Sequence, residues 1–179
     1  MELGLRRGTV AVEPHDPEWE VSARQTIELL KDILGDTSTD IQHIGSTAVK
    51  SICAKPIIDI AVGVAVLDDI LEYNSILEEN GFIFRGHDLP GQYLYVCGGS
   101  DFRTHHIHIV VHDSKEWNNY VNMRDYLNSH EADAAAYSVL KESLAEQYPD
   151  DRETYTAMKS DLINDILRKA EAWRMEPEI

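Results

Sequence analysis

Residues 42–62 read QHIGSTAVKSICAKPIIDIAV, and the rest of the chain is arranged around this stretch. The alternating run that ends at Ile44 predicts a strand. The Gly45-Ser46 pair predicts a tight turn, because glycine permits a backbone bend and serine favours the N-cap position of a helix. We therefore expect a short helix over residues 47–53 with Ser46 as its N-cap. Backbone N–H groups at such a helix start could bind an anionic group such as phosphate.

A single carboxylate marks the strand that follows. The run from Ile57 to Val64 is nearly all apolar, which is typical of a strand covered on both faces, and Asp59 is its only charge. Because an unpaired carboxylate is costly to bury, Asp59 is expected near the end of the strand, facing a cleft, a metal ion or a cation. The alternative is a structural role, in which Asp59 accepts backbone hydrogen bonds or pairs with Lys55.

These motifs, HIGSTAV at residues 43–49 and AKPIIDI at residues 54–60, resemble the signature of the GrpB family. The resemblance runs from PHDPEW at residues 14–19 through HHIHIVV at residues 105–111 to MRDYL at residues 123–127. It implies an α/β (α+β) nucleotidyltransferase-like fold, with a mixed β-sheet flanked by helices and a helical C-terminal third, in one domain over residues 1–179. Family members also occur joined to dephospho-CoA kinase, which implies a connection with CoA or nucleotide metabolism.

The resemblance also indicates where site residues lie. In nucleotidyltransferases a Gly-Ser turn precedes a strand with two carboxylates one residue apart, and a third carboxylate lies on a later strand. Gly45 and Ser46 match the turn and Asp59 matches the first carboxylate, whereas Ala61 stands where the second would be. Two-metal phosphoryl transfer needs enough anionic ligands for two ions about 3.5 to 4 Å apart, and one aspartate alone is a weak Mg²⁺ site. The usual two-metal set is therefore incomplete.

Further candidate ligands lie in RTHHIHIVV, residues 103–111. Strand geometry places His106 and His108 on the same face. If this strand neighbours that of Asp59, the carboxylate and the two imidazoles form a set suited to a divalent metal ion, for which Mg, Mn and Zn are the candidates. The alternative is that the histidines hydrogen-bond to backbone or carboxylate groups and bind no metal.

The other candidates are polar groups close to these motifs. His43 is a candidate general acid or base beside Asp59, because imidazole titrates near neutral pH. For Arg124, within MRDYL, a surface ion pair is the alternative to a phosphate contact. The candidates for phosphate or nucleotide binding are Gly45, Ser46, Thr47, Lys55, Arg103 and Arg124.

Charge and composition narrow the possible partners. The formal net charge of −16 opposes a phosphate-backbone partner, so no long nucleic acid is expected. Residues 41–66 carry only two lysines and Asp59 as formal charges, so a small anion could still bind there. No apolar run is long enough for a membrane span and the start lacks a secretory signal, which together predict a cytoplasmic protein with no membrane partner. Cys53 and Cys97 fit neither a disulfide framework nor a zinc-finger spacing.

Periodicity and turn residues predict the remaining elements. Asp16 and Pro17 indicate the start of a helix over residues 18–34. Strands are expected at residues 9–12, 82–84 and 92–97, with the last two in a hairpin. Asp113 and Glu116 resemble a capping box that begins the first of three C-terminal helices, and the second is expected over about residues 131–147.

Two functions from different classes follow. The first is a nucleotidyltransferase-like enzyme with a reduced carboxylate set, in which a divalent metal assists transfer of a nucleotidyl group to a small acceptor. The second is a catalytically weakened sensor or accessory domain that binds a nucleotide or phosphometabolite. The absence of an acid at Ala61 favours the second. In both, the partner is a small phosphorylated molecule or a nucleotide, and the sequence leaves the oligomeric state open.

Overall fold

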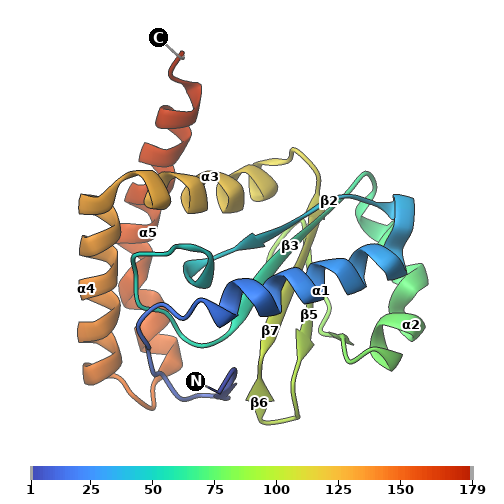
Figure 1. Ribbon diagram of the computed structural model, residues 1–179, viewed down its shortest axis with the longest axis horizontal. Coiled ribbons are helices and arrows are strands. Elements are labelled where there is room, and N and C mark those ends of the chain that lie inside the picture. The colour runs from blue at the N-terminus through green and yellow to red at the C-terminus, as the bar shows by residue number, and fades with distance from the viewer. Residues whose placement is uncertain (1, 178–179) are drawn as a thin grey trace.

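The computed structural model describes residues 2–177, which form a mixed five-stranded sheet flanked by helices (Figure 1). The strand order is β2-β3-β7-β5-β4, and only β3 and β7 run parallel. The predicted mixed sheet is thereby confirmed. The strands are β2 (Ser38–Ile44), β3 (Ile58–Val64), β4 (Ile83–Phe84), β5 (Gln92–Cys97) and β7 (His105–Val111), and β1 (Leu5–Arg6) pairs separately with β6 (Phe102–Arg103).

The helices lie on both sides of this sheet. Figure 1 shows α1 across one face and α3 to α5 grouped together at the other side of the molecule. No helix in residues 2–177 is both long enough and apolar enough to cross a membrane. The α-helices are α1 (Glu18–Leu34), α2 (Asn74–Glu79), α3 (Lys115–Ser129), α4 (Glu131–Gln147) and α5 (Arg152–Met175), with 3₁₀ turns at Gly35–Thr37, Ser46–Ala48 and Leu67–Tyr73.

Strand β3 separates two environments because its side chains alternate between the faces of the sheet. Ile58, Ile60 and Val62 are fully buried in the core that α1 covers. On the other face, Ala61 is also fully buried, in a cluster that includes Trp117 of α3. Asp59 lies on this second face, beyond the region that Trp117 covers, and its side chain is 28% exposed.

The segment after the Gly-Ser turn differs from the prediction. Instead of a helix over residues 47–53, there is a three-residue 3₁₀ turn with Gly45, not Ser46, as its N-cap. Val49 then takes an extended conformation, and Val49 and Ile52 are both 1% exposed in a core formed with α3, α4 and α5. Burial of these two apolar side chains against the C-terminal helices outweighs the local preference for continuing the helix.

Two other local predictions are wrong. The N-terminal strand lies at Leu5–Arg6 rather than residues 9–12, because Val10 instead packs against Tyr155, with its N–H bonded to the carbonyl of Pro149. Helix α3 is capped by Ser114, whose side chain accepts a hydrogen bond from the Trp117 N–H, and no Asp113–Glu116 capping box forms. In contrast, α1 and α4 span the predicted residues, and β4 and β5 form the predicted hairpin.

Candidate functional site

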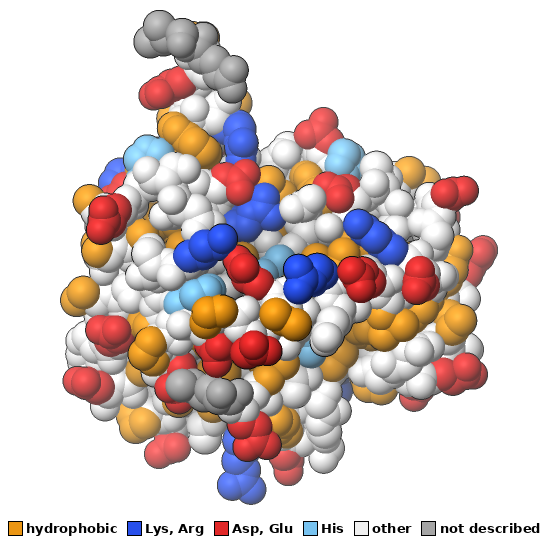
Figure 2. Space-filling view, viewed as in Figure 1, with side chains coloured by type: hydrophobic (Ala, Val, Ile, Leu, Met, Phe, Trp, Pro, Cys, Tyr) orange, Lys and Arg blue, Asp and Glu red, His pale blue; other side chains and the backbone are white. Residues whose placement is uncertain are grey.

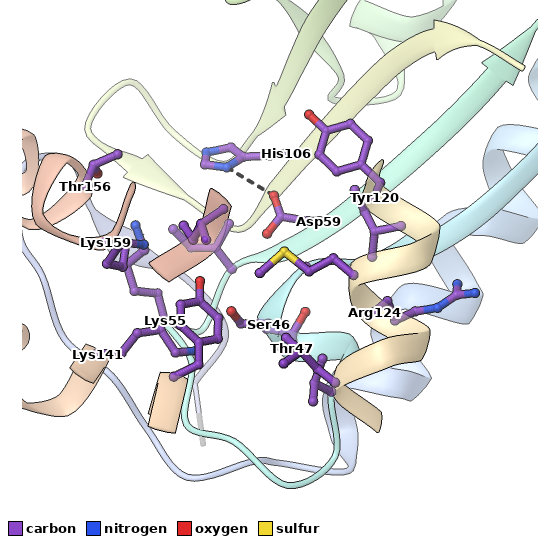
Figure 3. A pocket seen from close by; sticks show the side chains of 18 of the residues that line it. Ser46, Thr47, Lys55, Asp59, His106, Tyr120, Arg124, Lys141, Thr156 and Lys159 are labelled. Atoms are coloured by element: carbon purple, nitrogen blue, oxygen red, sulfur yellow. Dashed lines mark ion pairs between the residues drawn. The ribbon is translucent and has the colours of Figure 1, made fainter. Parts of the chain in front are cut away.

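A cavity of about 420 Å³ lies between the exposed end of the β3–β7 pair and helices α3, α4 and α5 (Figure 3). The Gly-Ser turn forms part of its wall, and the strands contribute Asp59, His106 and His108. The helices contribute both apolar and basic side chains. The lining residues of α5 fall on one face of that helix, because they are spaced at i, i+3, i+4, i+7 and i+11. They are Arg152, Tyr155, Thr156, Lys159 and Ile163.

Asp59 and two histidines meet in this wall because β3 and β7 are adjacent and parallel. Asp59 is in register with His106 and Ala61 with His108, so both imidazoles reach the same carboxylate. The distance from Asp59 Oδ1 is 3.0 Å to His108 Nε2 and 3.5 Å to His106 Nδ1. Burial alone would raise the pKa of Asp59, but these two histidines outweigh it and hold the pKa well below its ordinary value. Asp59 is therefore an anion at neutral pH.

His108 is oriented from its other side. Its Nδ1 lies 3.3 Å from Gln92 Nε2 and 3.4 Å from the Tyr120 hydroxyl. Since an amide nitrogen can only donate, His108 Nδ1 accepts and Nε2 carries the proton that it donates to Asp59. His106 Nε2 has no hydrogen-bond partner in residues 2–177, which leaves that nitrogen available to a ligand.

Gly45 is required for the turn to approach Asp59. Its φ is +72°, a region that L-residues other than glycine rarely adopt. A Cβ at this position would lie 2.8 Å from Asp59 Oδ2 and 3.0 Å from Asp59 Cβ. The turn therefore contacts the carboxylate directly, which places Ser46 and Thr47 in the same wall.

Four cations line the cavity opposite this carboxylate. They are Lys55, Lys141, Arg152 and Lys159, and Figure 3 shows the three lysines together on one side. None of the four forms an ion pair with an acid of the described chain, and Asp59 is the only acid among the lining residues. Lys141 is 2% exposed and donates to the carbonyl of Cys53.

This concentration of positive charge has an electrostatic cost. Burial, followed by repulsion from Lys55 and Lys141, lowers the pKa of Lys159 to about 7. Burial likewise lowers the pKa of Lys141 to about 8, and the pKa of Lys55 is also below its ordinary value, chiefly through burial and then Arg152. An anion in the cavity would offset this cost.

Tyr155 contributes a polar atom without a partner. Its side chain is fully buried, and its hydroxyl makes no hydrogen bond within the described residues. Lys159 Nζ lies 4.3 Å from the centroid of its ring and Lys55 Nζ lies 5.4 Å from it. Such an unsatisfied hydroxyl is uncommon in folded proteins, and a ligand group or water at the cavity would satisfy it.

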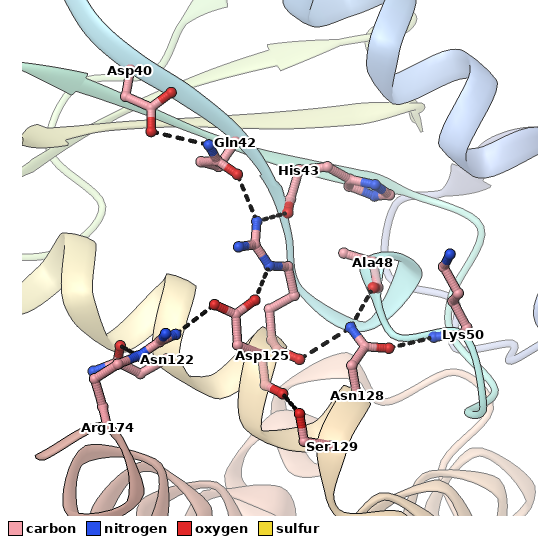
Figure 4. A network of polar contacts seen from close by, with 11 residues as sticks. Asp40, Gln42, His43, Ala48, Lys50, Asn122, Asp125, Asn128, Ser129 and Arg174 are labelled. Atoms are coloured by element: carbon pink, nitrogen blue, oxygen red, sulfur yellow. Dashed lines mark hydrogen bonds and ion pairs between the residues drawn. The ribbon is translucent and has the colours of Figure 1, made fainter. Parts of the chain in front are cut away.

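The structure brings most of the predicted site residues together. The cavity is lined by Gly45, Ser46, Thr47, Lys55, Asp59, His106 and His108. Arg124 also lines it, but its guanidinium is held by Gln42 Oε1 at 2.9 Å, the His43 carbonyl at 3.0 Å and Asp125 at 2.8 Å. Figure 4 shows this network, which connects α3 to β2. Arg124 therefore fastens the sheet to the helices, and its donors are largely engaged.

Two predicted residues lie outside the cavity. His43 is not among the lining residues, and its Nε2 lies 2.8 Å from Thr47 Oγ1. Burial lowers the pKa of His43 to about 4, so the ring is neutral at pH 7 and positions the turn. Arg103 donates to the carbonyl of Gly99 at 2.6 Å and lines a separate hollow.

Asp59, His106 and His108 do not form a ready metal site. Within residues 2–177, no group of three or more His, Cys, Asp or Glu side chains is arranged to hold a metal ion. Both histidines are directed at one oxygen of Asp59, so a resident metal would have to displace these contacts. The second carboxylate position is Ala61, which is buried beside Trp117 and offers no ligand.

Sequence reasoning missed the cations of the C-terminal helices. Lys141, Arg152 and Lys159 were assigned to no site, because the C-terminal third as a whole is acidic. A signal was present in the spacing of Arg152, Tyr155 and Lys159, which puts two cations and an aromatic ring on one face of α5.

Comparison with known proteins relates the whole arrangement to one family. The family model described as GrpB protein matches residues 9–169. The Glutamate-rich protein GrpB of Alkalihalophilus pseudofirmus is 36% identical over 173 residues, which cover 93% of this chain and 99% of that protein. The crystal structure of the conserved protein GrpB from Enterococcus faecalis is 32% identical, covers 93% of this chain and all of that chain, and superposes with a TM-score of 0.87.

A more distant likeness concerns the fold alone. A crystal structure of the Cid1 poly(U) polymerase with MgGTP bound is 17% identical and has a TM-score of 0.51. The match covers 75% of this chain and 44% of that one. The sheet and its flanking helices therefore have the architecture of a nucleotidyltransferase.

Proposed function

The chain belongs to the GrpB family, and from this premise we propose that it binds a nucleotide or a small phosphorylated metabolite in the cavity between the sheet and helices α3 to α5. One observation carries the proposal. Lys55, Lys141, Arg152 and Lys159 converge on the cavity without an acidic partner in the described chain. The chain has 32 acids and 16 Lys and Arg residues, so acids to pair with these four cations are plentiful. Four cations that remain without an acidic partner favour an anionic ligand.

The chemistry of this group fits phosphoryl oxygens. A lysine ammonium binds phosphate as a point charge, and Arg152 can add paired hydrogen bonds. Because the pKa values of Lys141 and Lys159 are lowered to about 8 and about 7, bound phosphate would restore their charge and take up protons from solvent.

The remaining walls fit the apolar part of such a ligand. Met123 and Leu127 of α3 and Ile163 of α5 line the cavity beside the cations. A volume of about 420 Å³ lies within the range of about 300 to 1,000 Å³ that is usual for small-molecule sites. A base or another flat group could pack on these side chains while its phosphates meet the lysines.

Transfer of a nucleotidyl group to a small acceptor is the second candidate, and His106 favours it. The ionised Asp59 holds His106 Nδ1 at 3.5 Å, and His106 Nε2 remains available in the cavity wall. His106 could therefore act as general base toward an acceptor hydroxyl, with Asp59 as its orienting partner. Asp59 is the one lining carboxylate in the described chain that could contact a divalent metal, and such an ion would supply charge stabilisation to the transferred phosphate.

Thermal stabilisation by ligands tests the binding proposal. The unfolding temperature is measured with AMP, ADP, ATP, GTP and dephospho-CoA, each with and without Mg²⁺, Mn²⁺ or Zn²⁺. A ligand at about a hundred times its Kd adds about 2.7 kcal/mol, or a shift of about 5 to 10 °C for a chain of this size. If no phosphorylated compound shifts the wild-type protein, the proposal is wrong.

Release of pyrophosphate from a bound triphosphate distinguishes the two candidates. Turnover that is lost in both Asp59→Asn and His106→Gln, with ATP binding retained, would establish the enzyme. Binding without turnover, unchanged in Asp59→Asn, would establish the binding protein.

A further inference from the structure

A second group of cations adjoins the cavity. A shallow hollow of about 10 Å³ lies beside the N-terminal segment and shares Lys55 and Arg152 with the cavity, so a group bound there would project into solvent. Its other basic lining residues are Arg6, Arg7 and Arg103, and no acid lines it. Lys55 and Arg152 thus lie on the wall between two hollows that both carry basic side chains. Elsewhere the chain is rich in acids, and Figure 2 shows acidic side chains spread over one face of the molecule.

The fold holds these arginines together despite their repulsion. Strand β1 pairs with β6, which puts Leu5 opposite Arg103 and Arg6 opposite Phe102. Burial, followed by repulsion from Arg7 and other arginines, lowers the pKa of Arg103. Gly4 N–H bonds to the Pro56 carbonyl, which fixes the same segment next to Lys55. Backbone pairing therefore maintains an unfavourable charge arrangement.

The arginines also lack acidic partners. Arg6, Arg7, Arg103 and Arg152 form no ion pair within residues 2–177. Arg103 is 8% exposed and uses one terminal nitrogen, Nη1, to bond to the carbonyls of Gly99, Ser100 and Phe102, while Nε and Nη2 make no hydrogen bond within residues 2–177. Four guanidinium groups and the Lys55 ammonium line this hollow, and they are the cations that bind phosphate by charge-assisted hydrogen bonds.

We propose that this hollow is a second phosphate subsite and that the ligand carries two separate phosphoryl groups, one bound by Lys141 and Lys159 and the other by Arg6, Arg7 and Arg103. Lys55 and Arg152 lie between them and contribute to both. The inference rests on the proposed binding function and narrows its ligand class, from phosphorylated compounds in general to bisphosphorylated small molecules such as nucleoside bisphosphates.

A matched pair of probes tests this subsite. AMP and adenosine 3′,5′-bisphosphate differ by one phosphoryl group, and their affinities are measured by calorimetry at constant ionic strength. The bisphosphate is expected to bind the wild-type chain at least about tenfold more tightly, since a charge-assisted phosphate contact is worth that much. The double variant Arg6→Gln/Arg7→Gln should lose this advantage and keep its affinity for AMP.

The controls separate this inference from the function on which it rests. Arg24→Gln/Lys31→Gln removes the same charge from α1, away from both hollows, and should retain the tenfold advantage. Lys159→Met should weaken both probes. If the advantage persists in Arg6→Gln/Arg7→Gln, or is absent in the wild type while AMP binds, the second subsite is refuted and the binding function stands. If neither probe binds the wild type, the second subsite is refuted, and the thermal series with the other phosphorylated compounds decides the binding function.

Discussion

Replacing Lys159 by Met should make the protein more stable and a poorer binder. Lys159 has no acidic partner in the described chain, and burial with repulsion from Lys55 and Lys141 lowers its pKa from 10.5 to about 7. The charged ammonium is therefore disfavoured in the folded state. Methionine retains the length and apolar stem of the side chain and removes the charge.

The size of the effect follows from this pKa. One pKa unit corresponds to about 1.4 kcal/mol, so the shift sets an upper limit of about 5 kcal/mol on the penalty. Water and counterions at the cavity mouth relieve part of it, and we expect Lys159→Met to raise the free energy of unfolding by about 1 to 2 kcal/mol at pH 6. Affinity for ATP should fall about 10- to 100-fold, because a hydrogen bond to a charged group contributes about 1.5 to 3 kcal/mol.

The pH dependence has a definite sign. The folded pKa of about 7 lies below the unfolded value of 10.5, so the penalty is fully present below pH 7 and disappears as pH rises toward 10.5. The stability gain from Lys159→Met should therefore be largest at pH 6 and smallest near pH 10. Urea unfolding at pH 6, 8 and 10 measures it.

A lysine on the same helix provides the control. Lys169 is ion-paired with Asp133 at 3.1 Å and Asp165 at 3.3 Å, and lies outside the cavity. Lys169→Met should leave ATP affinity unchanged and lower stability slightly. The reasoning is refuted if Lys159→Met is less stable than the wild type at pH 6, or if it binds ATP equally well.

Three further substitutions test the architecture of the site. Gly45→Ala should lower the free energy of unfolding in urea by about 2 kcal/mol or more, because it adds a strained backbone conformation and a 2.8 Å contact with Asp59 Oδ2. An unchanged free energy of unfolding would show that the turn can accept a Cβ beside the carboxylate. Ala61→Asp introduces the second carboxylate but buries it beside Trp117. We expect the free energy of unfolding to fall by about 3 kcal/mol or more, with no Mg²⁺ binding in calorimetry. A stable variant that binds Mg²⁺ would contradict this. Arg124→Met should lower stability by about 1 to 3 kcal/mol while ATP affinity changes by less than about threefold, and a selective loss of affinity would instead make Arg124 a ligand contact.

The sequence was most informative where a pattern is local and repeated. The apolar stripe of α1 and the extent of α4 follow from helical periodicity. The convergence of Asp59 with His106 and His108 could be anticipated once their strands were taken as neighbours, because alternation puts the two histidines on one face. The sequence left that pairing as a condition, and the structure supplies it.

The sequence was least informative where tertiary packing decides. The helix predicted over residues 47–53 is lost because Val49 and Ile52 are needed in the core with the C-terminal helices. The spacing of Arg152, Tyr155 and Lys159 puts Lys159 on a basic face of α5, but only the folded chain places that face and Lys141 across the cavity from the strands and the Gly-Ser turn. Arg124, predicted as a phosphate contact, does line the cavity, but nothing in the sequence indicated that its Nη1 bonds to Gln42 and the His43 carbonyl of β2.

Calorimetric titration of ATP into the wild-type chain at pH 8, in buffers of different ionisation enthalpy, tests the central claim most directly. If phosphates bind among Lys141 and Lys159, whose pKa values are about 8 and about 7, each binding event should take up protons from the buffer. The observed enthalpy would then depend on the buffer. An absence of binding, or binding whose enthalpy is the same in every buffer, would contradict the account.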